Sequence, residues 1–182
     1  MLLCLVLSAC YEVNKEVITR DVASAVPGLE GKFNGGYIFA FDLTRDEHIW
    51  IERENAFICS PDRRKCFSKV LDRYTVKRFR AVPLRDNIWI FQFPHPTRTG
   101  SYRIEFYRVF PRHQTIGLVV PQFKNKKEHA AHASRFGVRM MANRATDPYD
   151  DYYPRLSGKR GDILAFLLSL RSRKFVSGQG GE

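Results

Sequence analysis

Between residues 37 and 120 the chain repeats one pattern, in which short runs of alternating apolar and polar residues are separated by turn residues. In the first run, large apolar side chains recur at every second position: Tyr37, Phe39, Phe41 and Leu43. A period of two is typical of a strand with one buried face. The later runs have the same character, and together they predict strands at residues 37–43, 48–52, 56–59, 66–70, 74–82, 87–93, 101–110 and 114–120.

Seven or eight short strands with short connections favour an antiparallel meander, because parallel strands need crossover connections of a dozen or more residues. We therefore expect a mainly β (α+β) fold, a small barrel or sandwich that occupies residues 32–121. The chain has fourteen Phe and eight Tyr among its 182 residues. This supply of large rings favours a barrel interior that is filled by side chains.

The period changes after Pro121, where the sequence predicts two helices. Residues 125–136 begin with Asn125, a favoured N-cap, and residues 162–170 begin with Asp162, which can cap the second helix. We expect the region 122–175 to pack on the sheet and to cover an open edge or end of it. Residues 176–182 are mostly small and polar and predict a disordered tail.

The N-terminal decapeptide MLLCLVLSAC carries no charged side chain and is too short to span a bilayer as a helix. Its last four residues, LSAC, match the lipobox of bacterial lipoproteins, in which the leader is cut before a cysteine that receives a lipid. The match predicts a signal peptide at residues 1–9, lipidation of Cys10 and a polar tether over residues 10–31. Two features depart from a typical signal peptide, because no Lys or Arg precedes the apolar run and the run is short. An ordinary apolar strand or helical turn is the alternative.

The chain has four cysteines, Cys4, Cys10, Cys59 and Cys66. Removal of the leader and lipidation of Cys10 would leave Cys59 and Cys66 as a pair in an oxidising compartment. These two bracket a polar turn between predicted strand ends, and a hairpin of that size brings two Cα atoms within disulfide distance. We expect a Cys59–Cys66 disulfide, with two free buried thiols as the alternative.

Three runs carry a resemblance to known proteins: VPGLEGKF, RFRAVPLRDNIWIFQF and SYRIEFYRVF. Between residues 27 and 120 the chain resembles a group of small proteobacterial lipoproteins of unassigned function. In that group a Cys-anchored tether leads to a Gly-aromatic strand start and a Tyr-rich strand. The resemblance supports Cys10 and implies no catalytic residue. With the lipobox, it predicts a membrane-anchored protein of the bacterial cell envelope that faces the periplasm, on the outer membrane.

The chain is basic, with 30 Lys and Arg against 19 Asp and Glu and a net charge of +11. Such a charge favours anionic partners such as nucleic acid, phospholipid headgroups and anionic envelope polymers. A solvated surface that only aids solubility is the alternative. No RNA-recognition, zinc-finger or helix-turn-helix signature is present. We therefore expect as partners the membrane, anionic envelope components or another envelope protein, and not nucleic acid.

Few residues are candidates for chemistry. His129 and His132 lie one helical turn apart and, with Glu128, could bind a metal, although an exposed polar helix also explains them. An acidic group could hold a cation but lacks the spacing of a calcium loop: Asp147, Asp150 and Asp151. No GxSxG, P-loop or dinucleotide signature occurs. We expect no cofactor, no metal and no catalysis, hence a binding or structural role. The alternatives are a soluble basic nucleic-acid-binding module and a small hydrolase with an unrecognised site.

Overall fold

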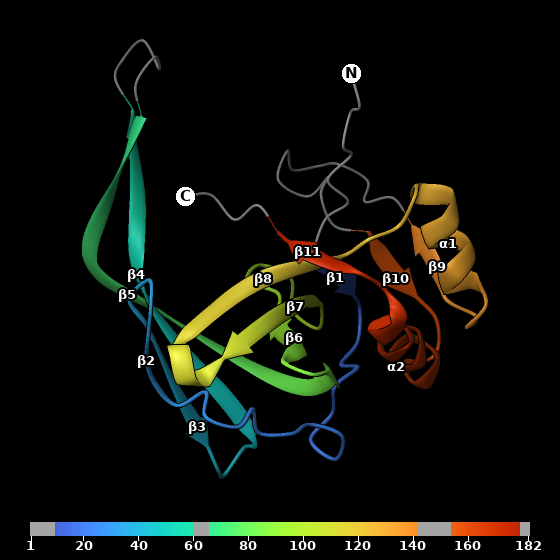
Figure 1. The fold of residues 1–182 in the computed structure, drawn as a ribbon, viewed down its shortest axis with the longest axis horizontal. Coiled ribbons are helices and arrows are strands. Elements are labelled where there is room, and N and C mark those ends of the chain that lie inside the picture. Colours follow the sequence, from blue (N-terminus) through green and yellow to red (C-terminus); the bar gives the residue numbers. More distant parts are fainter. Residues whose placement is uncertain (1–9, 60–65, 142–153, 179–182) are drawn as a thin grey trace.

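The computed structural model describes residues 10–59, 66–141 and 154–178 of the chain (Figure 1). These ranges form eleven strands and two α-helices, with short 3-10 turns, so the predicted mainly β fold with two C-terminal helices is confirmed. The elements are, in chain order, β1 (Cys10–Val13), β2 (Gly31–Phe33), β3 (Tyr37–Asp42), β4 (Glu47–Cys59), β5 (Cys66–Arg85), β6 (Ile88–Pro94), β7 (Tyr102–Phe110), η1 (Pro111–His113), β8 (Thr115–Pro121), α1 (Lys126–Ser134), β9 (Arg139–Met141), β10 (Arg155–Ser157), α2 (Arg160–Ser169), η3 (Leu170–Ser172) and β11 (Phe175–Ser177).

The strands form one mixed, strongly curved sheet that is not closed (Figure 1). The order along the sheet is β2-β3-β4-β5-β6-β7-β1-β10-β9, and β8 pairs with both β7 and β11. From β2 to β8 each strand pairs antiparallel with the next in sequence, as the meander predicts. β1 and β10 are parallel. The curvature leaves an open side between β3 and β4 on one hand and β8 on the other, and this side holds the grooves described below.

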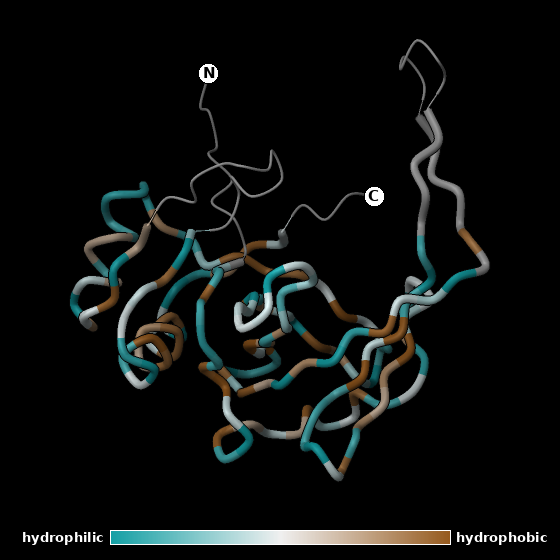
Figure 2. Tube along the Cα trace, turned by 180° about the vertical axis from the view of Figure 1, so that it is seen from behind, coloured by the Kyte–Doolittle hydropathy of each residue, from teal (hydrophilic) through white to brown (hydrophobic). Residues whose placement is uncertain are grey.

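Strands β5, β6 and β7 bury side chains on both faces, in two separate cores. The inner core contains Phe79, Phe91 and Val109, and it also holds Trp50 of β4. The other, which we name the helix-side core, packs the opposite strand faces against α2 and includes Ile90, Ile104, Phe106, Phe166 and Leu167. Burying each side chain of this size contributes roughly 1.5–3 kcal/mol. The hydrophobic stretches in Figure 2 follow the strands of the body and α2, in agreement with these two cores.

The segment after Cys10 belongs to the folded body, so the expected tether over residues 10–31 is wrong. β1 lies inside the sheet between β7 and β10, with Tyr11 opposite Ile104. Apolar side chains of this segment are at most 1% exposed at four positions, Tyr11, Val13, Val17 and Ile18. They occur singly or in pairs among charged residues, which gives the segment a polar sequence although its apolar side chains are buried.

A buried amide holds the chain beyond β1 against the sheet. The side chain of Gln92, on β6, is 3% exposed. Its Oε1 accepts the N–H groups of Val17 at 2.7 Å and Ile18 at 2.8 Å, and its Nε2 donates to the carbonyl oxygen of Ile18 at 3.2 Å. A buried backbone group left without a partner costs about 1–3 kcal/mol, so these bonds fix the segment in place.

Two strands are longer than expected and form a projecting arm. β4 joins the strands predicted at 48–52 and 56–59, and β5 joins those at 66–70 and 74–82. β3 pairs with β4 only as far as Ile51, and β6 pairs with β5 only from Arg80. Among the described residues, β4 from 52 to 59 and β5 from 66 to 75 therefore pair with no strand other than each other. We name these residues the arm, which extends away from the body in Figure 1.

The C-terminal region confirms one predicted cap and corrects two other expectations. Asn125 caps α1, since its side chain accepts the N–H of Glu128 at 2.8 Å. α2 begins at Arg160, so Asp162 lies in its first turn, where its charge suits the helix dipole but does not cap. Phe175–Ser177 is a strand that pairs with β8, so the expected disordered tail from residue 176 is wrong there. Residues 179–182 lie outside the described ranges.

Candidate functional site

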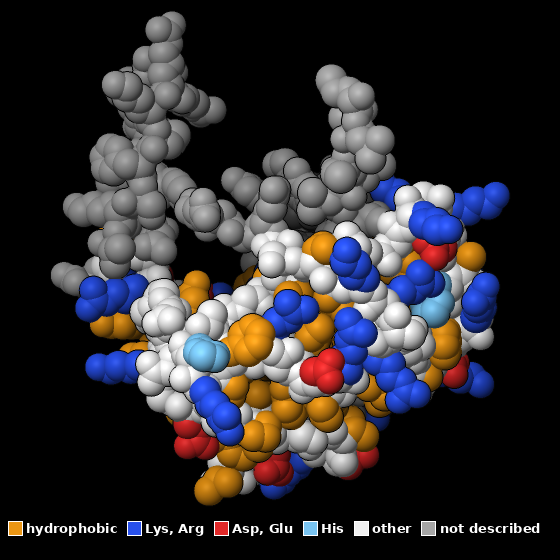
Figure 3. All heavy atoms as spheres, viewed as in Figure 1, with side chains coloured by type: hydrophobic (Ala, Val, Ile, Leu, Met, Phe, Trp, Pro, Cys, Tyr) orange, Lys and Arg blue, Asp and Glu red, His pale blue; other side chains and the backbone are white. Residues whose placement is uncertain are grey.

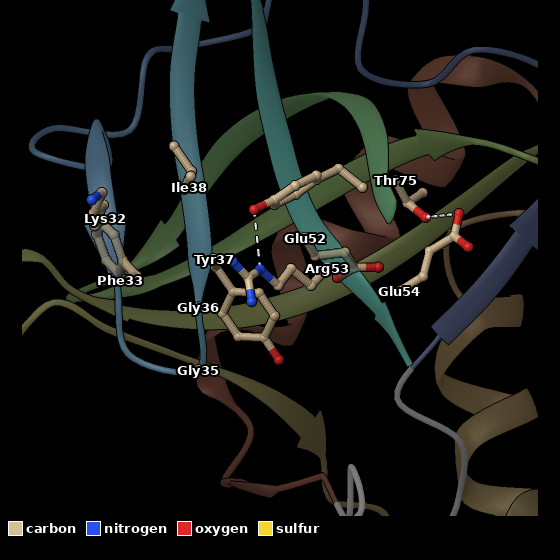
Figure 4. Close-up of a pocket in the computed structure, with 11 residues that line it drawn as sticks. Lys32, Phe33, Gly35, Gly36, Tyr37, Ile38, Glu52, Arg53, Glu54 and Thr75 are labelled. Carbon is tan, nitrogen blue, oxygen red and sulfur yellow. Dashed lines mark hydrogen bonds between the residues drawn. The ribbon is translucent and has the colours of Figure 1, made fainter. Parts of the chain in front are cut away.

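The open side of the sheet holds two adjoining grooves. The first, which we name the arm groove, has a volume of about 940 Å³ and lies between the β2–β3 turn and the base of the arm (Figure 4). The second, the seam groove, has a volume of about 570 Å³ and lies between β3 and β4 on one side and β7, β8 and β11 on the other. Tyr37 and Glu52 line both grooves, which therefore meet at these side chains. Volumes of this size are typical of ligand sites.

A glycine shapes the entrance to the arm groove. Gly35 has a φ of +87°, a conformation that L side chains rarely adopt. A Cβ at this position would also lie 2.8 Å from the ring of Tyr37, closer than real Cβ contacts. The turn therefore depends on glycine to let Tyr37 lie where both grooves meet.

Side chains at the base of the arm are tied together across the β4–β5 pair. Arg53 donates from Nε to the hydroxyl of Tyr74 at 3.0 Å, and its guanidinium carbon lies 5.6 Å from the centre of that ring. The hydroxyl of Thr75 donates to a carboxylate oxygen of Glu54 at 3.2 Å. Figure 4 shows Arg53, Glu54 and Thr75 along the wall of the groove. This wall of the groove is thus polar, and hydrogen bonds between β4 and β5 side chains fix its conformation.

The floor of the seam groove is aromatic. Trp50 makes edge contacts with Tyr37 at 5.2 Å and with Tyr107 at 5.4 Å between ring centres. The ammonium of Lys77 lies 5.5 Å from the Trp50 ring and pairs with Glu52. The indole N–H of Trp50, which is 5% exposed, has no partner among the described residues. The aromatic rings of the floor therefore lie beside the Lys77–Glu52 ion pair. This combination suits the binding of a ligand with both apolar and polar parts.

The grooves contain no constellation typical of nucleophilic or metal catalysis in the part of the chain that the structure describes. Neither lining includes a His or a Cys among its described residues. No group of three His, Cys, Asp or Glu side chains with metal-ligand geometry occurs among the residues described. The acidic group at residues 147–151 lies outside the described ranges.

The two histidines of α1 are packing residues and do not face a common open site. His129 is 3% exposed, bonds through Nε2 to the hydroxyl of Tyr11 at 2.7 Å and stacks on Phe123 at 3.9 Å. Burial lowers the pKa of His129 to about 4. His132 bonds through Nε2 to the hydroxyl of Ser169 at 2.9 Å. The expectation of an exposed polar helix is therefore wrong for His129, which joins α1 to β1.

The backbone places the predicted disulfide pair in register. Cys59 and Cys66 are directly opposite each other at the end of the arm that the structure describes. Opposite residues of an antiparallel pair have Cα atoms about 4.5–5.5 Å apart, inside the range that a disulfide requires. The register supports a Cys59–Cys66 bond, for which only the backbone is described.

Alkylation under non-reducing conditions should modify neither Cys59 nor Cys66 in protein isolated from an oxidising compartment, because a disulfide blocks both thiols. The Cys59→Ala variant should expose one thiol, at Cys66, and should lower the free energy of unfolding by about 2–3 kcal/mol. Intact-protein mass spectrometry after alkylation and urea unfolding measure these effects. Alkylation of Cys59 and Cys66 in the unreduced wild type would contradict the bond.

Comparison of the chain with protein-family models, with curated proteins and with solved structures finds no match. No helix in the described part of the chain combines the length and the apolar character needed to cross a bilayer.

Proposed function

We propose that this chain is a bacterial envelope lipoprotein, anchored through Cys10, with a non-enzymatic binding role. One observation carries the proposal: the lipobox LSAC ends at Cys10. Cleavage before Cys10 would leave β1 whole, because β1 pairs with β7 from Cys10 onward. The same residue would be the site of lipid attachment and the first residue of the folded body.

The binding role is supported by the two grooves on the open side of the sheet. They offer an aromatic floor and polar walls, and their linings include no described His or Cys. The register of Cys59 and Cys66 suits the same location, since disulfides persist in the periplasm and are rare in the cytosol.

Metabolic labelling with a clickable palmitate tests the anchor directly. The chain is expressed from its own locus in its native host, as wild type and as the Cys10→Ala and Cys4→Ala variants. We expect label on the wild type and on Cys4→Ala, because Cys4 lies in the segment that is removed. We expect none on Cys10→Ala, which lacks the thiol that takes the lipid.

Two results would overturn the proposal: an unlabelled wild type, or equal label on the wild type and Cys10→Ala. The Cys4→Ala variant is the matched control, because it removes a thiol from the same apolar segment without touching the lipobox cysteine. Fractionation of the same cells should find the wild type with membranes and Cys10→Ala less tightly held there, since lipid chains contribute about 0.8 kcal/mol per buried CH₂.

A further inference from the structure

Several basic side chains surround the end of the molecule at which β1 begins. Cys10 lies opposite Glu105 of β7, and the next residue, Tyr11, bonds to His129 of α1. The connection from β8 into α1 crosses this end of the body in Figure 1. Lys174 lies beside this connection, because its carbonyl oxygen accepts the N–H of Gln122 at 2.8 Å. The start of β1, the start of α1 and the start of β11 are therefore neighbours.

Four exposed lysines lie in these neighbouring segments, and we name them the basic end: Lys124, Lys126, Lys127 and Lys174. Figure 3 shows Lys and Arg side chains gathered on the side of the molecule where α1 lies. None of the four lysines has a carboxylate partner among the described residues.

The carboxylate closest in sequence, Glu128, is already engaged. It pairs with Arg173 at 2.7 Å and accepts the N–H of Lys124 at 2.6 Å. The hydrogen bond from Arg173 holds the pKa of Glu128 below its usual value, so this carboxylate is ionised and matched to Arg173. The positive charge of the four lysines is therefore not neutralised by Glu128.

We propose that the basic end binds the anionic phospholipid headgroups of the membrane in which Cys10 is anchored. The inference rests on the proposed function and deepens it. Because β1 starts at Cys10 and lies inside the sheet, no spacer separates a lipid on Cys10 from the body. A membrane at Cys10 would therefore meet the end of the body that carries these lysines, and surface electrostatics reach about 8 Å at physiological salt. Each lysine near an anionic surface strengthens binding by about 1 kcal/mol, or roughly fivefold.

The test uses the full chain with Cys10→Ala, so that no lipid contributes. Co-sedimentation compares vesicles of phosphatidylcholine alone with vesicles that also contain phosphatidylglycerol. One variant replaces the four lysines of the basic end by Gln. A matched control replaces four exposed cations elsewhere by Gln, which changes the net charge equally: Arg45, Arg73, Arg112 and Lys159. The full chain includes residues 142–153, so their charges act as they do in the protein.

We expect the parent chain to prefer the anionic vesicles and to lose this preference at high salt. The variant of the basic end should bind anionic vesicles on the order of 1000-fold more weakly, because it lacks four lysines at about fivefold each, and the control variant should bind like the parent. Circular dichroism confirms that each variant is folded. Equal loss in both variants, or no preference for anionic vesicles in the parent, would overturn the proposal. RNA binding is measured for the same proteins. If the variant of the basic end bound anionic vesicles like the parent but no longer bound RNA, the result would also overturn the proposal and would indicate a nucleic-acid surface.

The labelling experiment tests the lipid anchor, and the vesicle experiment tests the basic end, so a negative result in one does not decide the other. Palmitate labelling reports the thiol of Cys10, which the vesicle experiment lacks. An unlabelled wild type would remove the anchor and leave the vesicle result to stand for a peripheral membrane protein. A labelled wild type with no vesicle preference would retain the anchor and remove the basic end as its lipid contact.

Discussion

The Glu12→Gln variant should lose about 1.5–3 kcal/mol of unfolding free energy, because a neutral amide replaces the buried carboxylate that accepts hydrogen bonds from a charged partner. Glu12 lies in β1 and is 2% exposed. Its two carboxylate oxygens each accept a bond from Nη1 of Arg98 at 2.9 Å, and Arg155 lies 3.7 Å away. Arg98 comes from the chain between β6 and β7, and Arg155 from β10, so one carboxylate holds the strands on both sides of β1 together.

Urea unfolding, followed by the fluorescence of Trp50 and Trp89, measures the loss. Asp46→Asn is the control, because Asp46 pairs with Arg20 at 2.6 Å but both side chains are largely exposed. Exposed pairs contribute about 0–1 kcal/mol. Asp46 has a φ of 52°, which asparagine also tolerates, so the control removes the charge without straining the backbone. Losses of equal size in the two variants would contradict the buried role of Glu12.

Stability should fall as the pH falls from about 6.5 to about 4, through two buried histidines. Burial lowers the pKa of both His48 and His129 from 6.5 to about 4. His48 accepts the N–H of Val26 through Nε2 at 3.1 Å and stacks on Phe79 at 4.9 Å. In this pH window the unfolded chain takes up protons that the folded chain does not, so acid favours unfolding. Each histidine contributes up to about 3 kcal/mol, fully present above pH 6.5 and lost by pH 4.

Unfolding free energies measured between pH 7.5 and pH 4 test this dependence. The His129→Gln variant keeps an acceptor for the hydroxyl of Tyr11 but does not titrate, so across the window its stability should fall by up to about 3 kcal/mol less than that of the wild type. Carboxylates that protonate near pH 4 also destabilise the fold, and they act equally in wild type and variant. The difference between the two curves therefore isolates His129. Parallel curves would show that this imidazole does not control the acid response.

The sequence predicted the strands of the meander because each of them is marked locally. Turn residues bound β6 and β7, and Asn125 marks the start of α1. No local sequence signal indicates that β1 is a strand inside the sheet. Its position depends on contact between Tyr11 and residues far along the chain, among them Ile104. The continuation of β5 through Pro83 also differs from the strand predicted at 74–82, because proline normally ends a strand. Its register shifts between Pro83 and Arg85, an irregularity at which a residue without an N–H is tolerated.

The grooves could not be predicted, because curvature of the sheet creates them. Tyr37, Trp50 and Tyr107 lie on three different strands and read separately as alternating core residues. They come together only at the open side of the sheet, where the indole N–H of Trp50 has no partner within the ranges that the structure describes. Glu12 was equally hidden, since a charged residue in a polar segment carries no sign of burial. The lipobox and the cysteine pair, in contrast, are local signals, and both lead to predictions that experiments can settle.

The position of β1 in the middle of the sheet sets the order in which this protein can reach its native state. Of the described strands, β1 is the first to be synthesised, yet it pairs with residues 102–105 and 155–156, so its pairing must wait until those residues have been made. Long-range pairing of this kind slows folding, because a long loop has to close before the contacts form. Until then the edge of β7 that receives β1 stays open to other strands, an exposure that favours misassembly. If the chain were anchored at Cys10, β10 would have to return to the anchored strand β1 to complete the sheet.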